Sequence, residues 1–190
     1  MIEHMKDRLG LAFFTFAAVV SALAAWEQPT ILAWLAAVHN AILAALYARR
    51  KPATSYDQRG LYLGILAAVL PLAAPYPAEI SMPALIIGLL GYGLVLWSLL
   101  ALGRSFGIAP ADRGLITQGP YRYIRHPMYL GELILRTALV VTSPQPLLAG
   151  ALLVALVIIQ IARALREERI IDTYSTYSSR VRYRLIPGVW

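Results

Sequence analysis

The sequence predicts an all-α fold, a polytopic integral membrane bundle of about six transmembrane helices with both termini on the cytoplasmic side. Hydrophobic residues make up 59% of the 190 residues, and charged residues only 14%. A soluble domain has about 45–50% apolar and about 25% charged residues. The excess apolar residues form long blocks, and the basic residues lie between alternate blocks. We therefore expect the blocks to lie in a bilayer rather than in a soluble core.

Six apolar segments come near the length of a transmembrane helix, which needs about 20 apolar residues to cross the hydrocarbon core. We expect the spans to be Leu9–Trp26, Ile31–Ala48, Leu61–Ala78, Pro83–Leu102, Met128–Thr142 and Pro146–Ala164. No small-residue cleavage site convincingly follows the first segment, so we interpret it as a retained span. The fifth is the shortest, and it carries Glu132 and Arg136.

The positions of Lys and Arg predict how the spans are oriented. In a six-span chain, every Lys and Arg except Arg136 falls on one side of the membrane, and the opposite loops contain none. Those opposite loops, at 27–30, 79–82 and 143–146, are short and polar or Pro-containing, so neighbouring spans should form antiparallel hairpins. The positive-inside rule then places both termini in the cytoplasm.

Polar sequence is concentrated in two segments, 103–126 and 163–190, and both fall on the cytoplasmic side. We therefore divide the chain into residues 1–102, which supply the first four spans and substrate access, and residues 103–190, which form a core of two spans, a loop and a tail. If the protein is an enzyme, the site should lie on the cytoplasmic side of a multi-pass protein, and we expect the cell inner membrane.

Composition excludes several kinds of site. The absence of cysteine excludes disulfides, thiolate metal sites and a cysteine nucleophile. The histidines His4, His39 and His126 are too scattered to predict a metal site. The formal charge of +7 lies beside hydrophobic segments, which favours contact with anionic membrane lipids over nucleic acid.

The segment 119–131 combines Pro, Gly, Tyr, Arg and His directly before the fifth span. Pro127 suits the first turn of a helix, and the helix N-terminus that it opens can hold an anion beside Arg125 and His126. A basic, aromatic belt at the membrane interface explains the tyrosines and Arg122 equally well. On composition alone both interpretations stay open.

Two further groups of charges are candidates. Arg163 and Glu167 are four residues apart at the end of the sixth span and share a helix face, whereas Glu168 should point elsewhere. Taken alone, this group is most simply a solvated helix end. Glu132 and Arg136 are also four apart, but inside a span, where charges are costly and tend to pair or face a cavity. They either neutralise each other or line a substrate cleft.

The C-terminal half resembles the isoprenylcysteine carboxyl methyltransferase family of membrane enzymes. The resemblance runs from about Leu102 to Trp190 and rests most specifically on the Arg-His-Pro-Met-Tyr element at 125–129, followed by the paired Glu167-Glu168. The segments Leu102-Gly-Arg-Ser-Phe and Gly114-Leu-Ile-Thr-Gln-Gly-Pro-Tyr-Arg-Tyr and the tail from Tyr174 to Pro187 add to it.

The resemblance implies S-adenosylmethionine as the methyl donor and S-adenosylhomocysteine as the product. Carried over, the nucleoside end would be lined by Arg113, Gly114, Leu115, Ile116 and Tyr121. The rest of the donor would be held by His126, Pro127, Met128, Tyr129 and Glu167. The carboxylate of the donor suits Arg125 and His126, because charged donors strengthen such hydrogen bonds.

The resemblance also implies that Arg163 faces the methyl acceptor. We expect a lipophilic or membrane-delivered acceptor, such as a prenylated cysteine, another carboxylate or thiol, or a small lipid. A neutral amine or alcohol would need a general base, for which Glu132 and Glu168 are candidates. A membrane reductase of the sterol-reductase type that uses NADPH is the alternative enzyme, and a non-enzymatic membrane protein is the third class.

Overall fold

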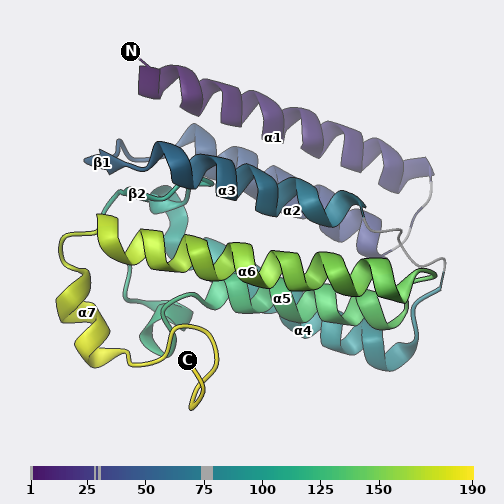
Figure 1. Ribbon diagram of the computed structural model, residues 1–190. Coiled ribbons are helices and arrows are strands. Elements are labelled where there is room, and N and C mark those ends of the chain that lie inside the picture. Colours follow the sequence, from purple (N-terminus) through teal and green to yellow (C-terminus); the bar gives the residue numbers. More distant parts are fainter. Residues whose placement is uncertain (1, 28, 30, 74–78) are drawn as a thin grey trace. The chain divides into compact units, whose positions relative to one another are not determined.

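Helices form at all six segments that the sequence marks as apolar (Figure 1). The computed structural model describes residues 2–27, 29, 31–73 and 79–190. The six helices are α1 Ile2–Glu27, α2 Ile31–Ala48, α3 Gln58–Val69, α4 Met82–Leu102, α5 Pro127–Val141 and α6 Pro146–Ile170. The predicted all-α class is thereby confirmed.

Within the residues that the structure describes, three helical stretches are long and apolar enough to cross a membrane by length and composition: Arg8–Glu27, Met82–Ser105 and Pro146–Ile170. A shorter apolar helix, Ala33–Ala48, lies within α2. The count of six spans, and the placement of both termini in the cytoplasm, stay predictions.

Two predicted spans differ from the helices at their C-terminal ends. The third was expected to run to residue 78, but α3 ends at Val69 and a 3₁₀ helix, η1 (Leu70–Ala73), follows. Pro71 explains the change, because proline has no backbone N–H to donate to the carbonyl four residues earlier. The remainder of that span, residues 74–78, lies outside the described residues. The sixth span was expected to end at Ala164, but α6 continues to Ile170.

The sequence did not predict the smaller elements. A short helix, α7 (Tyr174–Arg180), lies in the tail, and the loop after α4 contains the 3₁₀ helices η2 (Gly103–Ser105) and η3 (Gly119–Arg122). Two short strands, β1 (Ser55–Tyr56) and β2 (Ala111–Asp112), pair antiparallel with Ser55 opposite Asp112. This pairing ties the loop before α3 to the loop that leads toward α5.

The chain forms two compact units. One comprises Met1–Pro52 with Gly103–Phe106, and within it α1 packs along α2. There the side-chain amide of Asn40 donates to the hydroxyl of Ser21 at 2.9 Å, as expected for polar groups between membrane helices.

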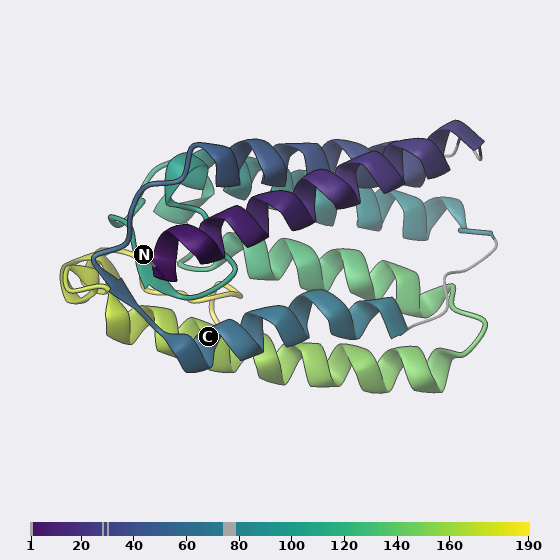
Figure 2. The same ribbon diagram turned by 90° about the horizontal axis from the view of Figure 1, so that it is seen from above.

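The other unit comprises Ala53–Leu102 with Gly107–Trp190. In it α5 packs against both α4 and α6, and α3 packs against α6 (Figures 1 and 2). One part of its core is formed by Ala67, Leu156 and Ile159, where α3 meets α6.

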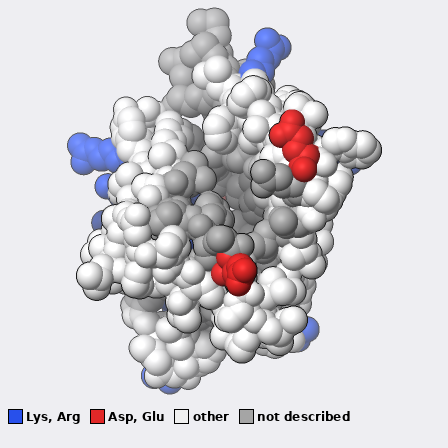
Figure 3. Space-filling model, turned by 90° about the vertical axis from the view of Figure 1, so that its right-hand side faces the viewer, with Lys and Arg blue, Asp and Glu red and all other residues white. Residues whose placement is uncertain are grey.

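Charge is distributed unevenly along the helix axes. The loops of the second unit at residues 79–81 and 143–145 contain no Lys or Arg. Figure 3, which views the molecule from the right-hand side of Figure 1, shows a face of mainly uncharged side chains, with Lys and Arg only at its margin. This asymmetry is the one on which the predicted orientation rests.

Close packing of α4 on α5 depends on two glycines. A Cβ atom built on Gly91 would lie 2.6 Å from the backbone nitrogen of Leu135 and 2.7 Å from the carbonyl oxygen of Gly131. A Cβ built on Gly131 would lie 2.7 Å from the carbonyl oxygen of Gly91. The two backbones therefore touch at a point where only glycine fits, as is common in membrane bundles.

We expect Gly91→Ala to destabilise the protein by about 1–3 kcal/mol, because the added methyl group meets backbone that cannot move aside. Gly93→Ala on the same helix is the matched control, since a Cβ there has nothing within 4 Å. Thermal unfolding of the two variants in detergent checks this. Equal unfolding temperatures for both would contradict the close contact between α4 and α5.

Candidate active site

The loop before α5 is shaped by a turn at Gly119 and by two prolines. Gly119 has a φ of 59°, and a Cβ there would approach Ala101 to 3.0 Å. The η3 turn that follows buries Tyr121, whose backbone carbonyl accepts a hydrogen bond from the Tyr177 hydroxyl at 2.5 Å. Pro127 then opens α5, with His126 at the N-cap position. The loop thus delivers Tyr121 and His126 to the cytoplasmic end predicted for α5 and α6.

The carboxylate of Glu168, near the end of α6, holds together the parts of this site. Arg184 of the tail donates to it twice, from Nε to Oε1 at 2.8 Å and from Nη2 to Oε2 at 2.9 Å. Arg125 of the loop donates from Nη1 to Oε1 at 3.2 Å. Two-pronged guanidinium–carboxylate contacts combine charge with directional hydrogen bonds. The ion pairs therefore join loop, tail and α6.

The guanidinium of Arg125 hydrogen-bonds mainly to backbone carbonyls of the tail. Its Nε donates to the carbonyl of Val181 at 2.7 Å, and its Nη2 to the carbonyls of Ser178 and Arg182 at 3.2 and 3.0 Å. The backbone N–H of Arg125 also donates to the carbonyl of Tyr183 at 2.9 Å. We expected this guanidinium to take a cofactor carboxylate, whereas the structure gives its donors to protein carbonyls and Glu168.

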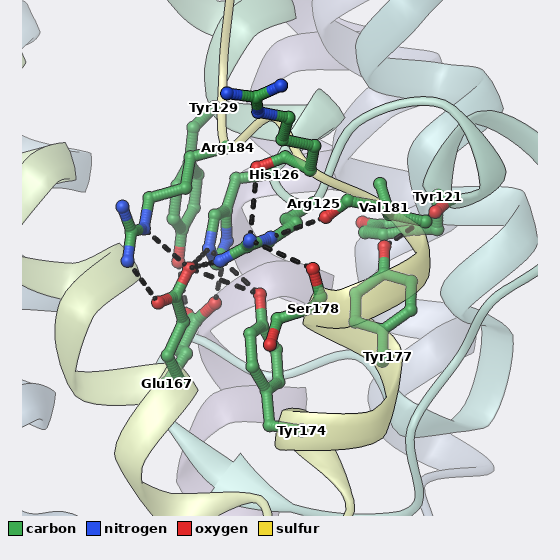
Figure 4. Close-up of polar contacts among 12 residues, drawn as sticks. Tyr121, Arg125, His126, Tyr129, Glu167, Tyr174, Tyr177, Ser178, Val181 and Arg184 are labelled. Atoms are coloured by element: carbon green, nitrogen blue, oxygen red, sulfur yellow. Dashed lines mark hydrogen bonds and ion pairs between the residues drawn. The ribbon is translucent and has the colours of Figure 1, made fainter. Parts of the chain in front are cut away.

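His126 lies between the rings of Tyr129 and Tyr174 (Figure 4). The imidazole is nearly parallel to the Tyr129 ring, with centroids 5.5 Å apart. Its Nδ1 is 3.5 Å from Glu167 Oε2, and its Nε2 is 3.4 Å from Glu168 Oε1. Burial alone would lower the pKa of His126, but hydrogen bonds and charge attraction from the two carboxylates outweigh it and raise the pKa above its ordinary value.

Both members of the glutamate pair therefore reach His126. Glu168 was expected to point elsewhere, and that expectation is wrong, because it turns toward the loop and tail and contacts the opposite edge of the imidazole. Glu167 accepts a hydrogen bond from the Tyr129 hydroxyl. Its side chain is 24% exposed, compared with 13% for Glu168. Glu167 is thus the more open carboxylate of the two.

A second polar group lies one to two turns earlier in α6, toward its N-terminus. The Arg163 guanidinium lies over the Tyr129 ring, with its Cζ 4.7 Å from the centroid, and donates from Nη2 to the carbonyl of Ile108 at 3.1 Å. From Nη1 it donates to the side-chain oxygen of Gln160 at 3.0 Å. The Gln160 amide in turn donates to Glu132 of α5. Tyr129 therefore contacts Arg163 with its ring and Glu167 with its hydroxyl.

The other predicted residues have the following surroundings. Arg113 is buried, and the N–H of Gly114 donates to the Asp112 carboxylate at 2.9 Å. Leu115 packs against α7, and Ile116 is half-buried beside it in sequence.

Met128 packs with Tyr129 and Ala164. Arg136 lies one turn beyond Glu132 on α5, and both are half-buried. The hydrogen bond of the Glu132 carboxylate crosses to α6 rather than staying on its own helix.

Sequence reasoning assigned no role to four residues that the structure brings into the site: Gln160, Tyr174, Tyr177 and Arg184. In the sequence, Tyr174 and Tyr177 stand out only by their spacing of three residues. Arg184 is one of several basic residues in the tail. Gln160 had one available signal, because it is a polar residue one turn before Arg163 within an apolar run.

A family model described as phospholipid methyltransferase matches residues 80–178. The matched region runs from before α4 into α7, and it contains the loop, both glutamates, His126 and Arg163. A comparison with curated proteins gave no match.

We expect the stability of the protein to fall as the pH rises above about 6.5, the ordinary pKa of histidine. A group whose pKa is raised on folding stabilises the folded state below its unfolded pKa, and this contribution is lost as the pH passes through the raised value. His126→Gln should remove this part of the pH dependence. Unfolding temperatures of both proteins in detergent, measured across neutral pH, check it. Parallel pH profiles would show that the carboxylates do not hold a proton on His126.

Proposed function

Because this chain belongs to the phospholipid methyltransferase family and is a membrane methyltransferase, we propose that it transfers the methyl group of S-adenosylmethionine to a lipophilic acceptor delivered from the membrane. The family generally uses this donor. The observation that carries the proposal is the juxtaposition of Glu167, His126 and the tyrosine rings beside Arg163. One set of residues suits the donor, and the neighbouring set suits an acceptor.

The residues present fit the donor chemically. When bound, it supplies a methyl group on a sulfonium cation, together with an ammonium and a carboxylate. Buried tyrosine rings attract cations through their π-electrons, and Tyr121, Tyr129 and Tyr174 provide such rings. Backbone and apolar groups of residues 113–116 would line the nucleoside end.

Of the two glutamates, we assign Glu167 to the donor ammonium. Glu168 already holds the guanidinium groups of Arg125 and Arg184. Glu167 accepts a hydrogen bond from the neutral hydroxyl of Tyr129 and lies 3.5 Å from Nδ1 of His126, and its side chain is the more exposed of the two. Glu168 then anchors loop and tail instead of acting as a base. His126 would orient Glu167 from one edge and meet the donor carboxylate through its charge.

On the acceptor side, we propose that Arg163 faces the incoming molecule, with Glu132 and Arg136 deeper along α5. Methyl transfer is an in-line displacement, so alignment of the reactants and exclusion of water supply most of the rate. The buried guanidinium of Arg163, fixed over Tyr129, would provide such alignment. An anionic acceptor group would need no base. A neutral amine would need one, and Glu132 is the candidate.

The site would open on the cytoplasmic side of the cell inner membrane. The basic residues Arg122, Arg169, Arg180 and Arg182 lie around it in sequence, and an aromatic, positively charged rim suits the anionic headgroups of that leaflet. The acceptor would then enter laterally from the lipid.

We expect His126→Ala and Glu167→Ala each to weaken the binding of S-adenosylhomocysteine by about 1–3 kcal/mol, the scale of losing a hydrogen bond to a charged group. Glu79→Ala, which removes an exposed carboxylate at the opposite end of α4, is the control. Calorimetry of purified protein in detergent measures all three. Normal binding by both site variants would refute the site assignment, and binding of NADPH instead of S-adenosylhomocysteine would favour a reductase.

We expect the double variant Glu132→Leu, Arg136→Met to fold and bind S-adenosylhomocysteine but to lose methyl transfer. The acceptor is first identified by incubating lipid extracts and small thiols with labelled donor and wild-type protein, followed by mass spectrometry. Arg163→Ala should likewise lower turnover more than donor affinity. Full activity of the double variant on that acceptor would show that the two charges serve only the fold.

A further inference from the structure

Gln160 is a polar side chain that the bundle buries completely, with none of its surface exposed. It lies on α6, inside a stretch long and apolar enough to cross a membrane. A buried amide is costly unless its donors and acceptor are hydrogen-bonded. Here both ends are used, because Nε2 donates to Glu132 and Oε1 accepts from Arg163.

The donor and acceptor ends of the Gln160 amide match its two neighbours. A glutamine side chain presents N–H donors at one end and an acceptor oxygen at the other, and the acidic Glu132 fixes which end faces α5. The oxygen must then face Arg163, whose Nη1 is 3.0 Å away. A carboxylate or an apolar group at position 160 could not satisfy both neighbours in this way.

Three elements fix the Arg163 guanidinium in place. The Gln160 oxygen holds Nη1, the Ile108 carbonyl of the loop holds Nη2, and the Tyr129 ring of α5 lies beneath the plane. Of these contacts, the one with Gln160 connects the guanidinium to the carboxylate of Glu132.

We propose that Gln160 is a positioning residue that aims the Arg163 guanidinium at an anionic group of the acceptor. The inference rests on the proposed function, in which Arg163 faces the acceptor. Glu132 is linked to Arg163 through the neutral amide, whose oxygen accepts the hydrogen bond from Nη1. A contacting carboxylate in this low-dielectric interior would compete strongly with an anionic acceptor group.

The test measures the binding of decyl phosphate, an amphiphile with an anionic head, to protein saturated with S-adenosylhomocysteine in neutral detergent. Calorimetry with Arg163→Ala sets the baseline. We expect Gln160→Met to weaken decyl phosphate binding about tenfold, the effect of one lost hydrogen bond to a charged group, and to leave S-adenosylhomocysteine binding unchanged. Gln145→Met, the same change at the exposed N-cap of α6, should alter neither.

A second variant, in which the residues at positions 132 and 160 are exchanged, tests the proposal even where Gln160→Met fails to fold. The double variant Glu132→Gln, Gln160→Glu keeps the net charge and the donor–acceptor pairing, but it places a carboxylate against Arg163. We expect it to bind S-adenosylhomocysteine normally and decyl phosphate about tenfold more weakly. Wild-type decyl phosphate binding by this variant would overturn the proposal, as would a wild-type protein that binds the probe no better than Arg163→Ala.

The two proposals fail separately. Failure of S-adenosylhomocysteine to bind the wild-type protein would count against the proposed function, whatever decyl phosphate does. Normal S-adenosylhomocysteine binding with unchanged probe affinity in both Gln160 variants would leave the methyltransferase site intact and reject only the role of Gln160.

Discussion

The contact on which the site depends is the one between the carboxylate of Glu168 and the guanidinium groups of Arg125 and Arg184. These three residues come from the helix, the loop and the tail, and backbone hydrogen bonds of Arg125 and His126 also join the loop to the tail. Breaking such a partly buried group leaves charge without compensation, so the three segments should keep one arrangement. With Glu168 committed to this role, its neighbour Glu167 can serve chemistry.

Tyr129 connects the two halves of the site. Its hydroxyl contacts Glu167, its ring lies parallel to His126 on one side, and Arg163 lies over the ring. A rigid aromatic side chain at the third position of α5 thus sets the separation between the residues assigned to the donor and those assigned to the acceptor. Few side chains could replace it, because both its face and its polar end are used.

The sequence was sufficient for the existence of the six long helices and for part of the cluster around His126. Long apolar blocks determine where helices form, and the 125–129 element with Glu167 and Glu168 pointed to the cluster around His126. It was insufficient where a choice depends on distant partners. Nothing local shows that Glu168 turns to Arg184, or that Glu132 crosses to Gln160. The end of α3 has a local cause, Pro71, which an apolar run alone does not show.

The uninterrupted course of α6 through Gln160, Arg163 and Glu167 has an evolutionary consequence. On one helix these side chains are spaced by a rise of about 1.5 Å per residue and a turn of about 100°. Inserting or deleting a single residue of any type between them would rotate one part of the site away from the other. Homologous chains should therefore vary freely in the length of the tail and loops, but not in the spacing of these three positions.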